Sequence, residues 1–112
     1  MTEQAGAVVD ERVFYRDIKP YDAPEELSQL HGPAEGLMAL PLNVYWGPAH
    51  RFDLNNESDV VEAYQAALRE GRVKDQAEIL NPGLLVSIWP ELLLPARVRV
   101  LWENRFPVLA AA

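Results

Sequence analysis

The stretch ESDVVEAYQAALREG, residues 57–71, decides the fold of this chain. Its apolar side chains recur at positions i, i+1, i+4, i+7 and i+8, which lie on one face of a helix. These side chains are Val60, Val61, Tyr64, Ala67 and Leu68. Asn55 or Asn56 can cap the first turn, and Gly71 suits a left-handed stop. The pattern predicts an amphipathic helix over residues 57–70.

The sequence after this helix is divided by prolines into further short helical segments. Residues 74–80 are predicted to form one or two helical turns. Asn81-Pro82 is typical of a cap followed by a first-turn proline, and Pro90 is expected to end that helix. Pro95 opens a last helix, which Phe106-Pro107 closes. The C-terminal half is therefore expected to contain three or four helices.

The first half of the chain predicts a short helix and a small antiparallel sheet, with Gly47-Pro48 as a turn. The helix is expected over residues 24–30, stopped by Gly32-Pro33. The strand candidates are residues 36–40, 44–46 and 50–54. The whole is an α+β fold with mostly short helices. Residues 1–10 are expected to be a disordered tail and residues 11–109 a single small domain, with Val13-Phe14-Tyr15 a strand or a docking arm.

The composition of the chain excludes several classes of function. The chain has 112 residues, a formal net charge of −7 and no cysteine, which excludes disulfides, thiol catalysis and cysteine-ligated zinc. The negative charge disfavours nucleic acid as a partner and suits a basic protein surface, or serves only solubility. No apolar run approaches the length of a membrane span, and Met1-Thr2-Glu3-Gln4 does not begin like a signal peptide. These features predict a cytoplasmic protein without a membrane contact.

No residue pattern predicts an enzyme, a metal site or a cofactor. The two imidazoles, His31 and His50, could be metal ligands, and His50 lies near Asp53 in the sequence. A catalytic zinc ion usually has three protein ligands, and no third candidate stands at a spacing typical of such a site. No serine stands in a nucleophile elbow, and no glycine-rich phosphate loop exists. The helix carboxylates Glu57, Asp59, Glu62 and Glu70 are interpreted as a solvated face. We therefore expect no catalytic, metal or cofactor residues.

The apolar C-terminal region allows two interpretations. Its tryptophans either pack the core or anchor a partner, because tryptophan and arginine are enriched at interface hot spots. Under the second interpretation the candidate partner-binding residues are Trp89, Leu92, Arg97, Arg99, Trp102, Arg105 and Phe106.

The motif LPARVRVLWENRFP, residues 94–107, follows Asn81-Pro82 and Ile88-Trp89-Pro90. Together with Leu40-Pro41, Trp46 and Phe52-Asp53-Leu54 upstream, it resembles a group of short actinobacterial proteins over residues 36–109. The genes of these proteins tend to lie beside genes for nucleotidyltransferase-like toxins. The resemblance implies an antitoxin whose acidic, apolar surface covers the basic surface of such a toxin. The motif itself contains no set of residues that is typical of a catalytic site.

Two alternatives belong to other classes. A DNA-binding regulator would use the arginines of the last helix, but Arg97 and Arg99 lie about 200° apart on an ideal helix and cannot line one face. A small enzyme or ligand-binding domain would use His50 and Asp53. The prediction adopted is a non-enzymatic protein-binding module, an antitoxin that neutralises a nucleotidyltransferase-type toxin.

Overall fold

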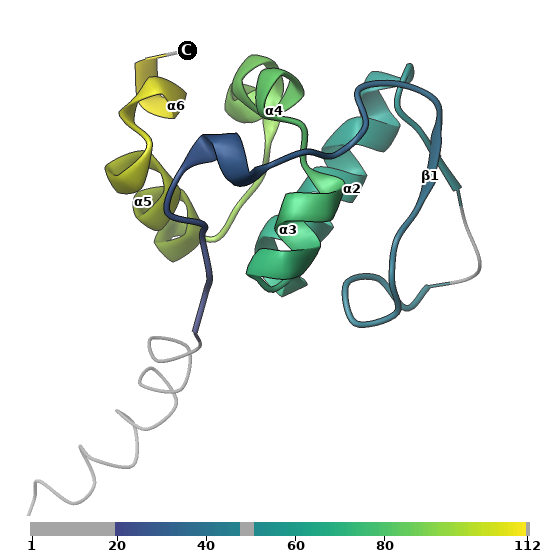
Figure 1. The fold of residues 1–112 in the computed structure, drawn as a ribbon, viewed down its shortest axis with the longest axis horizontal. Coiled ribbons are helices and arrows are strands. Elements are labelled where there is room, and N and C mark those ends of the chain that lie inside the picture. The colour runs from purple at the N-terminus through teal and green to yellow at the C-terminus, as the bar shows by residue number, and fades with distance from the viewer. Residues whose placement is uncertain (1–19, 48–50, 112) are drawn as a thin grey trace, which may run out of the picture.

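The computed structural model describes residues 20–47 and 51–111, and it confirms the predicted α+β class (Figure 1). A two-stranded antiparallel sheet lies in the first half, and the second half is helical. In chain order the elements are the 3-10 turn η1 (Leu27–Gln29), β1 (Leu37–Ala39), β2 (Arg51–Asp53), α2 (Glu57–Glu70), α3 (Val73–Ile79), α4 (Pro82–Ile88), the 3-10 turn η2 (Trp89–Glu91), α5 (Ala96–Arg105) and α6 (Pro107–Ala111). The predicted tail over residues 1–10, the patch over residues 13–15, Pro48 and His50 lie outside the described residues.

Helix α2 has the predicted bounds and the predicted buried stripe. Its Asn56 cap accepts a hydrogen bond from the Asp59 N–H at 3.1 Å. Val60, Tyr64 and Leu68 are buried, together with three alanines of the same helix. Small alanine side chains let neighbouring elements approach the helix closely, so α2 forms the centre of the molecule.

The end of α2 differs from the prediction. Gly71 has φ −81° and is not left-handed, because the chain leaves the helix in an extended conformation and enters α3 almost at once. Glycine is required there for space, since a Cβ on Gly71 would lie 2.7 Å from the Ala67 carbonyl oxygen.

The prolines end helices less abruptly than predicted. Trp89, which precedes Pro90, keeps helical dihedrals (φ −50°, ψ −45°), and η2 continues the turn of α4 as a 3-10 helix. Helix α5 ends at Arg105 as expected, but Pro107 then opens the additional helix α6. The described C-terminal half thus holds five α-helices, one more than the highest expected number.

The first half forms fewer regular elements than predicted. Residues 24–30 contain only the turn η1, which begins after Glu26 and ends at Gln29. Strands β1 and β2 pair with Met38 opposite Phe52, and both of these side chains are buried. Residues 44–46 are not a strand. Instead, Val44 and Tyr45 donate backbone hydrogen bonds to the Pro41 carbonyl in a turn, and Asn43 Nδ2 donates to Asp75 Oδ2 of α3 at 2.8 Å.

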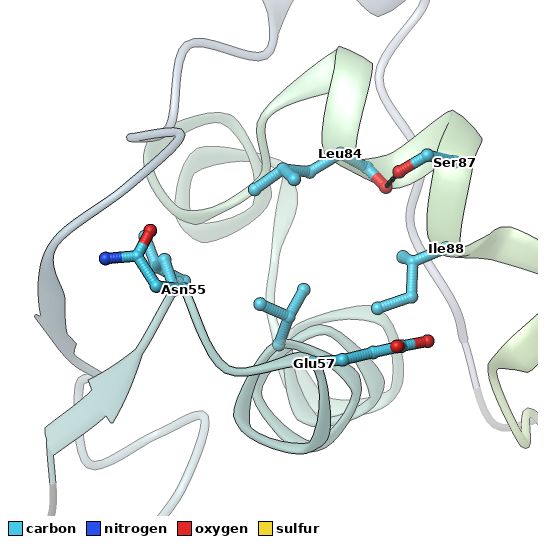
Figure 2. A pocket seen from close by; sticks show the side chains of 7 residues that line it. Asn55, Glu57, Leu84, Ser87 and Ile88 are labelled. Atoms are coloured by element: carbon cyan, nitrogen blue, oxygen red, sulfur yellow. Dashed lines mark hydrogen bonds between the residues drawn. The ribbon is translucent and has the colours of Figure 1, made fainter.

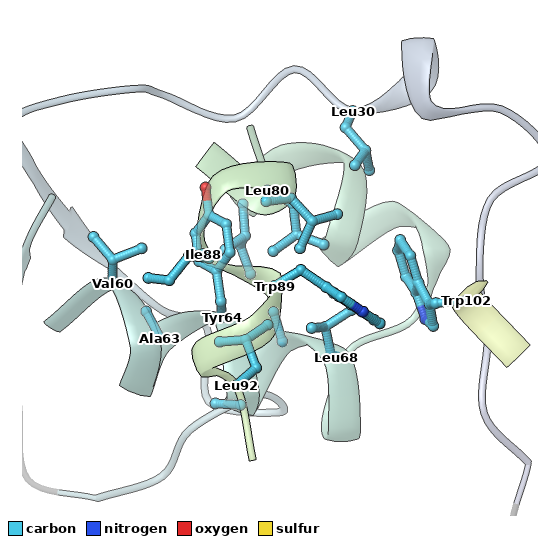
Figure 3. Packing of buried hydrophobic residues seen from close by; sticks show 14 of the residues in the cluster. Leu30, Val60, Ala63, Tyr64, Leu68, Leu80, Ile88, Trp89, Leu92 and Trp102 are labelled. Carbon is cyan, nitrogen blue, oxygen red and sulfur yellow. The ribbon is translucent and has the colours of Figure 1, made fainter. Parts of the chain in front are cut away.

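One contiguous core runs from the N-terminal segment, residues 20–36, to α6 (Figure 3). Trp89 lies between Leu68 of α2 and Trp102 of α5, and the centroids of the two indole rings are 6.4 Å apart. Phe106 extends this aromatic group at 5.5 Å from Trp102. Large aromatic side chains supply much of the apolar burial in so short a chain.

Asn81 joins three parts of the fold. Its backbone N–H donates to the Tyr64 hydroxyl of α2 at 2.9 Å, and its side-chain oxygen accepts from the Leu84 N–H at the start of α4. Its Nδ2 donates to the Gly32 carbonyl at 3.2 Å, which fixes the N-terminal segment as it crosses the molecule in Figure 1. The predicted cap is therefore also a tertiary contact.

Candidate functional site

The structure buries the apolar residues proposed as partner anchors. Trp89 is 1% exposed, Trp102 is 0% exposed, and Leu92 and Phe106 also belong to the core. The core interpretation therefore holds for these four side chains, and they do not offer an anchor on the surface of this conformation. The reason is tertiary: α5 and η2 turn their tryptophans toward each other and toward α2.

Arg99 is engaged within its own C-terminal region. Its guanidinium lies 5.1 Å from the Trp89 ring centroid, pairs with Glu103 at 3.4 Å and donates to the Leu92 carbonyl. The same Glu103 carboxylate accepts the Trp89 indole N–H at 2.8 Å. Arg99 and Glu103 thus cover one edge of the buried indole, and Arg99 acts as a structural residue.

The other two arginines of α5 contact the N-terminal segment. Arg105 donates to the carbonyls of Ala23 and Pro24 at 3.0 and 3.3 Å. Arg97 lies over the Tyr21 ring at 5.8 Å from the centroid. Arg97 and Arg105 thus both contact residues 21–24, whereas Arg99 contacts the C-terminal region, so all three guanidinium groups are engaged within the chain.

The described residues among those weighed for catalysis are His31 and Asp53, and they lie in separate surroundings. His31 is exposed, and its backbone N–H donates to the Ala77 carbonyl at 2.8 Å. The Asp53 carboxylate accepts the Asn55 N–H in a turn, and His50 lies outside the described residues. Over residues 20–47 and 51–111, no group of three or more acidic or histidine side chains could hold a metal ion. Within the same ranges, no helix is long and apolar enough to cross a membrane.

The exposed large apolar side chains are a different set from the predicted anchors. The described members of this set are Leu37, Leu42, Trp46, Leu93, Val100 and Val108. Leu93 is 80% exposed because the segment between the two prolines is extended, so that Leu92 faces the core and Leu93 faces away. The run Leu92-Leu93-Leu94 does not itself show which leucine faces the core, because all three residues are apolar. Val100 lies on the outer face of α5, beside a shallow hollow lined by Ala96, Arg97, Val100, Leu101 and Asn104.

A second hollow of about 330 Å³ opens between the start of α2 and helix α4 (Figure 2). Leu54, Val60, Leu84 and Ile88 line it with apolar surface, and Asn55, Glu57 and Ser87 add polar atoms. The sequence interpretation missed this site, because Glu57 was assigned to a solvated face and the approach of α4 to α2 is a tertiary feature.

Burial raises the pKa of the Tyr64 phenol above its ordinary value of 10.0, and the hydrogen bond from the Asn81 N–H offsets part of that rise. Tyr64 is fully buried and far from ionisation at neutral pH. Its hydroxyl therefore acts as a structural hydrogen-bond acceptor for the Asn81 N–H.

Comparison of the chain with protein-family models, with curated proteins and with solved structures gave no match, so its function is argued from its own residues.

Proposed function

We propose that this chain is a non-enzymatic protein-binding module, and that it acts as an antitoxin by covering the basic surface of a nucleotidyltransferase-type toxin. The observation that carries the proposal is an acidic surface that also exposes large apolar side chains. The chain has 17 acidic and 10 basic residues, and three of the basic ones are the α5 arginines engaged by neighbouring elements. A surface of this kind is complementary to a basic protein.

The apolar part of the binding surface lies at exposed positions of the C-terminal region. Leu93 and Val100 are 80% and 55% exposed, and both lie within residues 36–109, the range of the resemblance to toxin-associated proteins. Exposed apolar side chains that form a contiguous patch rimmed by polar ones are typical of protein interaction sites, and the proposal requires Leu93 and Val100 to contribute to such a patch. Leu93 and Val100 therefore replace the buried tryptophans as anchors in the proposal.

Co-purification tests the proposed partner. The chain is co-expressed with the product of its neighbouring gene, which the proposal expects to be nucleotidyltransferase-like, and we expect a stable complex that no longer transfers nucleotides to RNA. Leu93→Ser and Val100→Ser should weaken the complex, each by about 1 kcal/mol or more, without unfolding the chain. Leu42→Ser is the matched control, since Leu42 is 76% exposed but lies in the loop after β1.

The DNA-binding alternative is tested in parallel. Fluorescence anisotropy with promoter DNA at physiological salt should show no sequence-dependent binding by the isolated chain, because the guanidinium groups of Arg97, Arg99 and Arg105 are engaged within the chain. Tight, sequence-dependent DNA binding without a protein partner would overturn the proposal.

A further inference from the structure

The hollow between α2 and α4 combines an apolar floor with one carboxylate at its rim. In Figure 2, Leu84 and Ile88 of α4 lie above the start of α2, and the Glu57 carboxylate lies below Ile88 at one side of the hollow. Its volume of about 330 Å³ is at the lower end of the range for ligand pockets. The space therefore suits a side chain or a similarly small group.

Glu57 has no partner among the described residues, and the start of α2 does not need it. Asn56 supplies the cap of the helix, and Asp59 accepts the Asp53 N–H at 2.8 Å. Ser87 donates its hydroxyl proton to the Leu84 carbonyl at 3.0 Å, so its oxygen can only accept a further hydrogen bond. The Glu57 carboxylate, Ser87 Oγ and the Asn55 amide oxygen together offer three acceptors around the opening.

This combination favours one kind of occupant. Arginine and lysine side chains pair an aliphatic stem, which packs on apolar surface, with a head that only donates hydrogen bonds. No basic residue lines the hollow, so a cation entering it meets no cationic side chain there.

We infer that this hollow receives an arginine or lysine side chain from the surface of a protein partner, with the stem on Leu84 and Ile88 and the cationic head at Glu57. The inference rests on the proposed function, because a basic toxin surface is the source of such a side chain. The inference assigns to the proposed complex one defined contact, between a cationic side chain of the partner and Glu57. It also explains why Glu57 has no partner among the described residues of its own chain.

The test uses N-acetyl-arginine amide as the probe, with N-acetyl-citrulline amide as its neutral isostere. The ¹⁵N-labelled full chain is titrated by NMR with each probe at constant ionic strength. We expect saturable shifts at the amides of Asn55, Glu57 and Leu84 with arginine only. Glu57→Gln should weaken binding about fivefold, the usual size of a partly exposed ion pair. Glu62→Gln is the control, since Glu62 is an exposed glutamate of the same helix that does not line the hollow.

Three results would overturn the inference: equal shifts with citrulline, arginine binding that Glu57→Gln leaves unchanged, or the absence of any saturable shift. If the co-encoded protein co-purifies but the probe does not bind, the inference fails and the proposed function stands. If the probe binds at Glu57 but no protein co-purifies, the proposed function fails and the cation site stands.

Discussion

Tyr64 shows at the scale of a residue how one side chain serves both the core and a hydrogen bond. Its ring is fully buried in the stripe of α2, and its hydroxyl accepts the Asn81 N–H at 2.9 Å. Asn81 itself begins α4 and contacts Gly32. The phenol therefore connects α2 to the junction between α3 and α4.

Removing this hydroxyl should destabilise the fold. Tyr64→Phe leaves the Asn81 N–H without its acceptor, and we expect a loss of about 1–2 kcal/mol in the free energy of unfolding, measured by urea titration. The control is Ser87→Ala, which removes an exposed hydroxyl and should change stability by less than about 0.5 kcal/mol. Equal effects of the two substitutions would contradict this role of Tyr64.

The raised pKa of Tyr64 predicts alkaline sensitivity. Because the folded-state pKa lies above the ordinary value of 10.0, folding favours the protonated phenol. The corresponding stability is fully present below about pH 10 and is lost as the pH rises from there through the folded-state pKa. Urea titrations between pH 8 and pH 11 should therefore show a fall above pH 10 that is smaller in Tyr64→Phe. A pH profile that is identical in both proteins would rule out this linkage.

At the scale of elements, the N-terminal segment is fixed by backbone hydrogen bonds at the end of α3. The His31 N–H donates to the Ala77 carbonyl and the Gly32 N–H to the Leu80 carbonyl, both at 2.8 Å. Gly32 permits this approach, because a Cβ there would lie 2.2 Å from the Ile79 carbonyl oxygen. A segment without regular structure of its own is thus positioned by close backbone contact.

Gly32→Ala should force this segment away from α3. We expect a loss of about 2 kcal/mol or more in the free energy of unfolding, together with NMR shifts at Ala77 and Leu80. Gly83→Ala is the control, since Gly83 is exposed in the first turn of α4 and its Cβ would meet only the Asn81 side chain at 3.3 Å. That variant should cost much less stability than Gly32→Ala, because its Cβ would meet a side-chain oxygen at 3.3 Å and no backbone atom of a neighbouring segment. Equal tolerance of both substitutions would mean that the close contact does not constrain the fold.

At the scale of the whole molecule, the C-terminal region has two distinct surfaces. Its inner surface carries Trp89 and Trp102, which pack against each other and join α5 to the core. Its outer surface carries Leu93 and Val100. Stability and binding are therefore expected to depend on different residues of the same region.

Substitutions on the two surfaces should separate these roles. Trp102→Ala removes a fully buried indole, and we expect it to cost about 3–5 kcal/mol, enough to unfold much of a small protein. Val100→Ala should change the free energy of unfolding by less than about 0.5 kcal/mol. Circular dichroism with urea titration measures both. A stable, fully folded Trp102→Ala protein would show that the indole is not part of the core.

The sequence by itself determined the α+β class, the bounds of α2 and the caps at Asn56 and Asn81, because helix periodicity and capping are local properties of the chain. It also indicated that Pro95 and Pro107 bound α5, since a proline restricts its own backbone and that of the preceding residue. It did not determine the turn at residues 42–44, because the three consecutive apolar and aromatic residues Val44, Tyr45 and Trp46 could equally have formed a strand.

Only the tertiary structure decided which apolar residues of the C-terminal region are inside. Trp89, Leu92, Trp102 and Phe106 were equally compatible with a core and with an interface, because composition does not show which helix face a neighbouring helix covers. The same holds for Glu57 and Leu84, which lie 27 positions apart and share a hollow only because α4 packs beside the start of α2. Contacts between distant segments arise from packing, and the periodicity of a single segment carries no information about them.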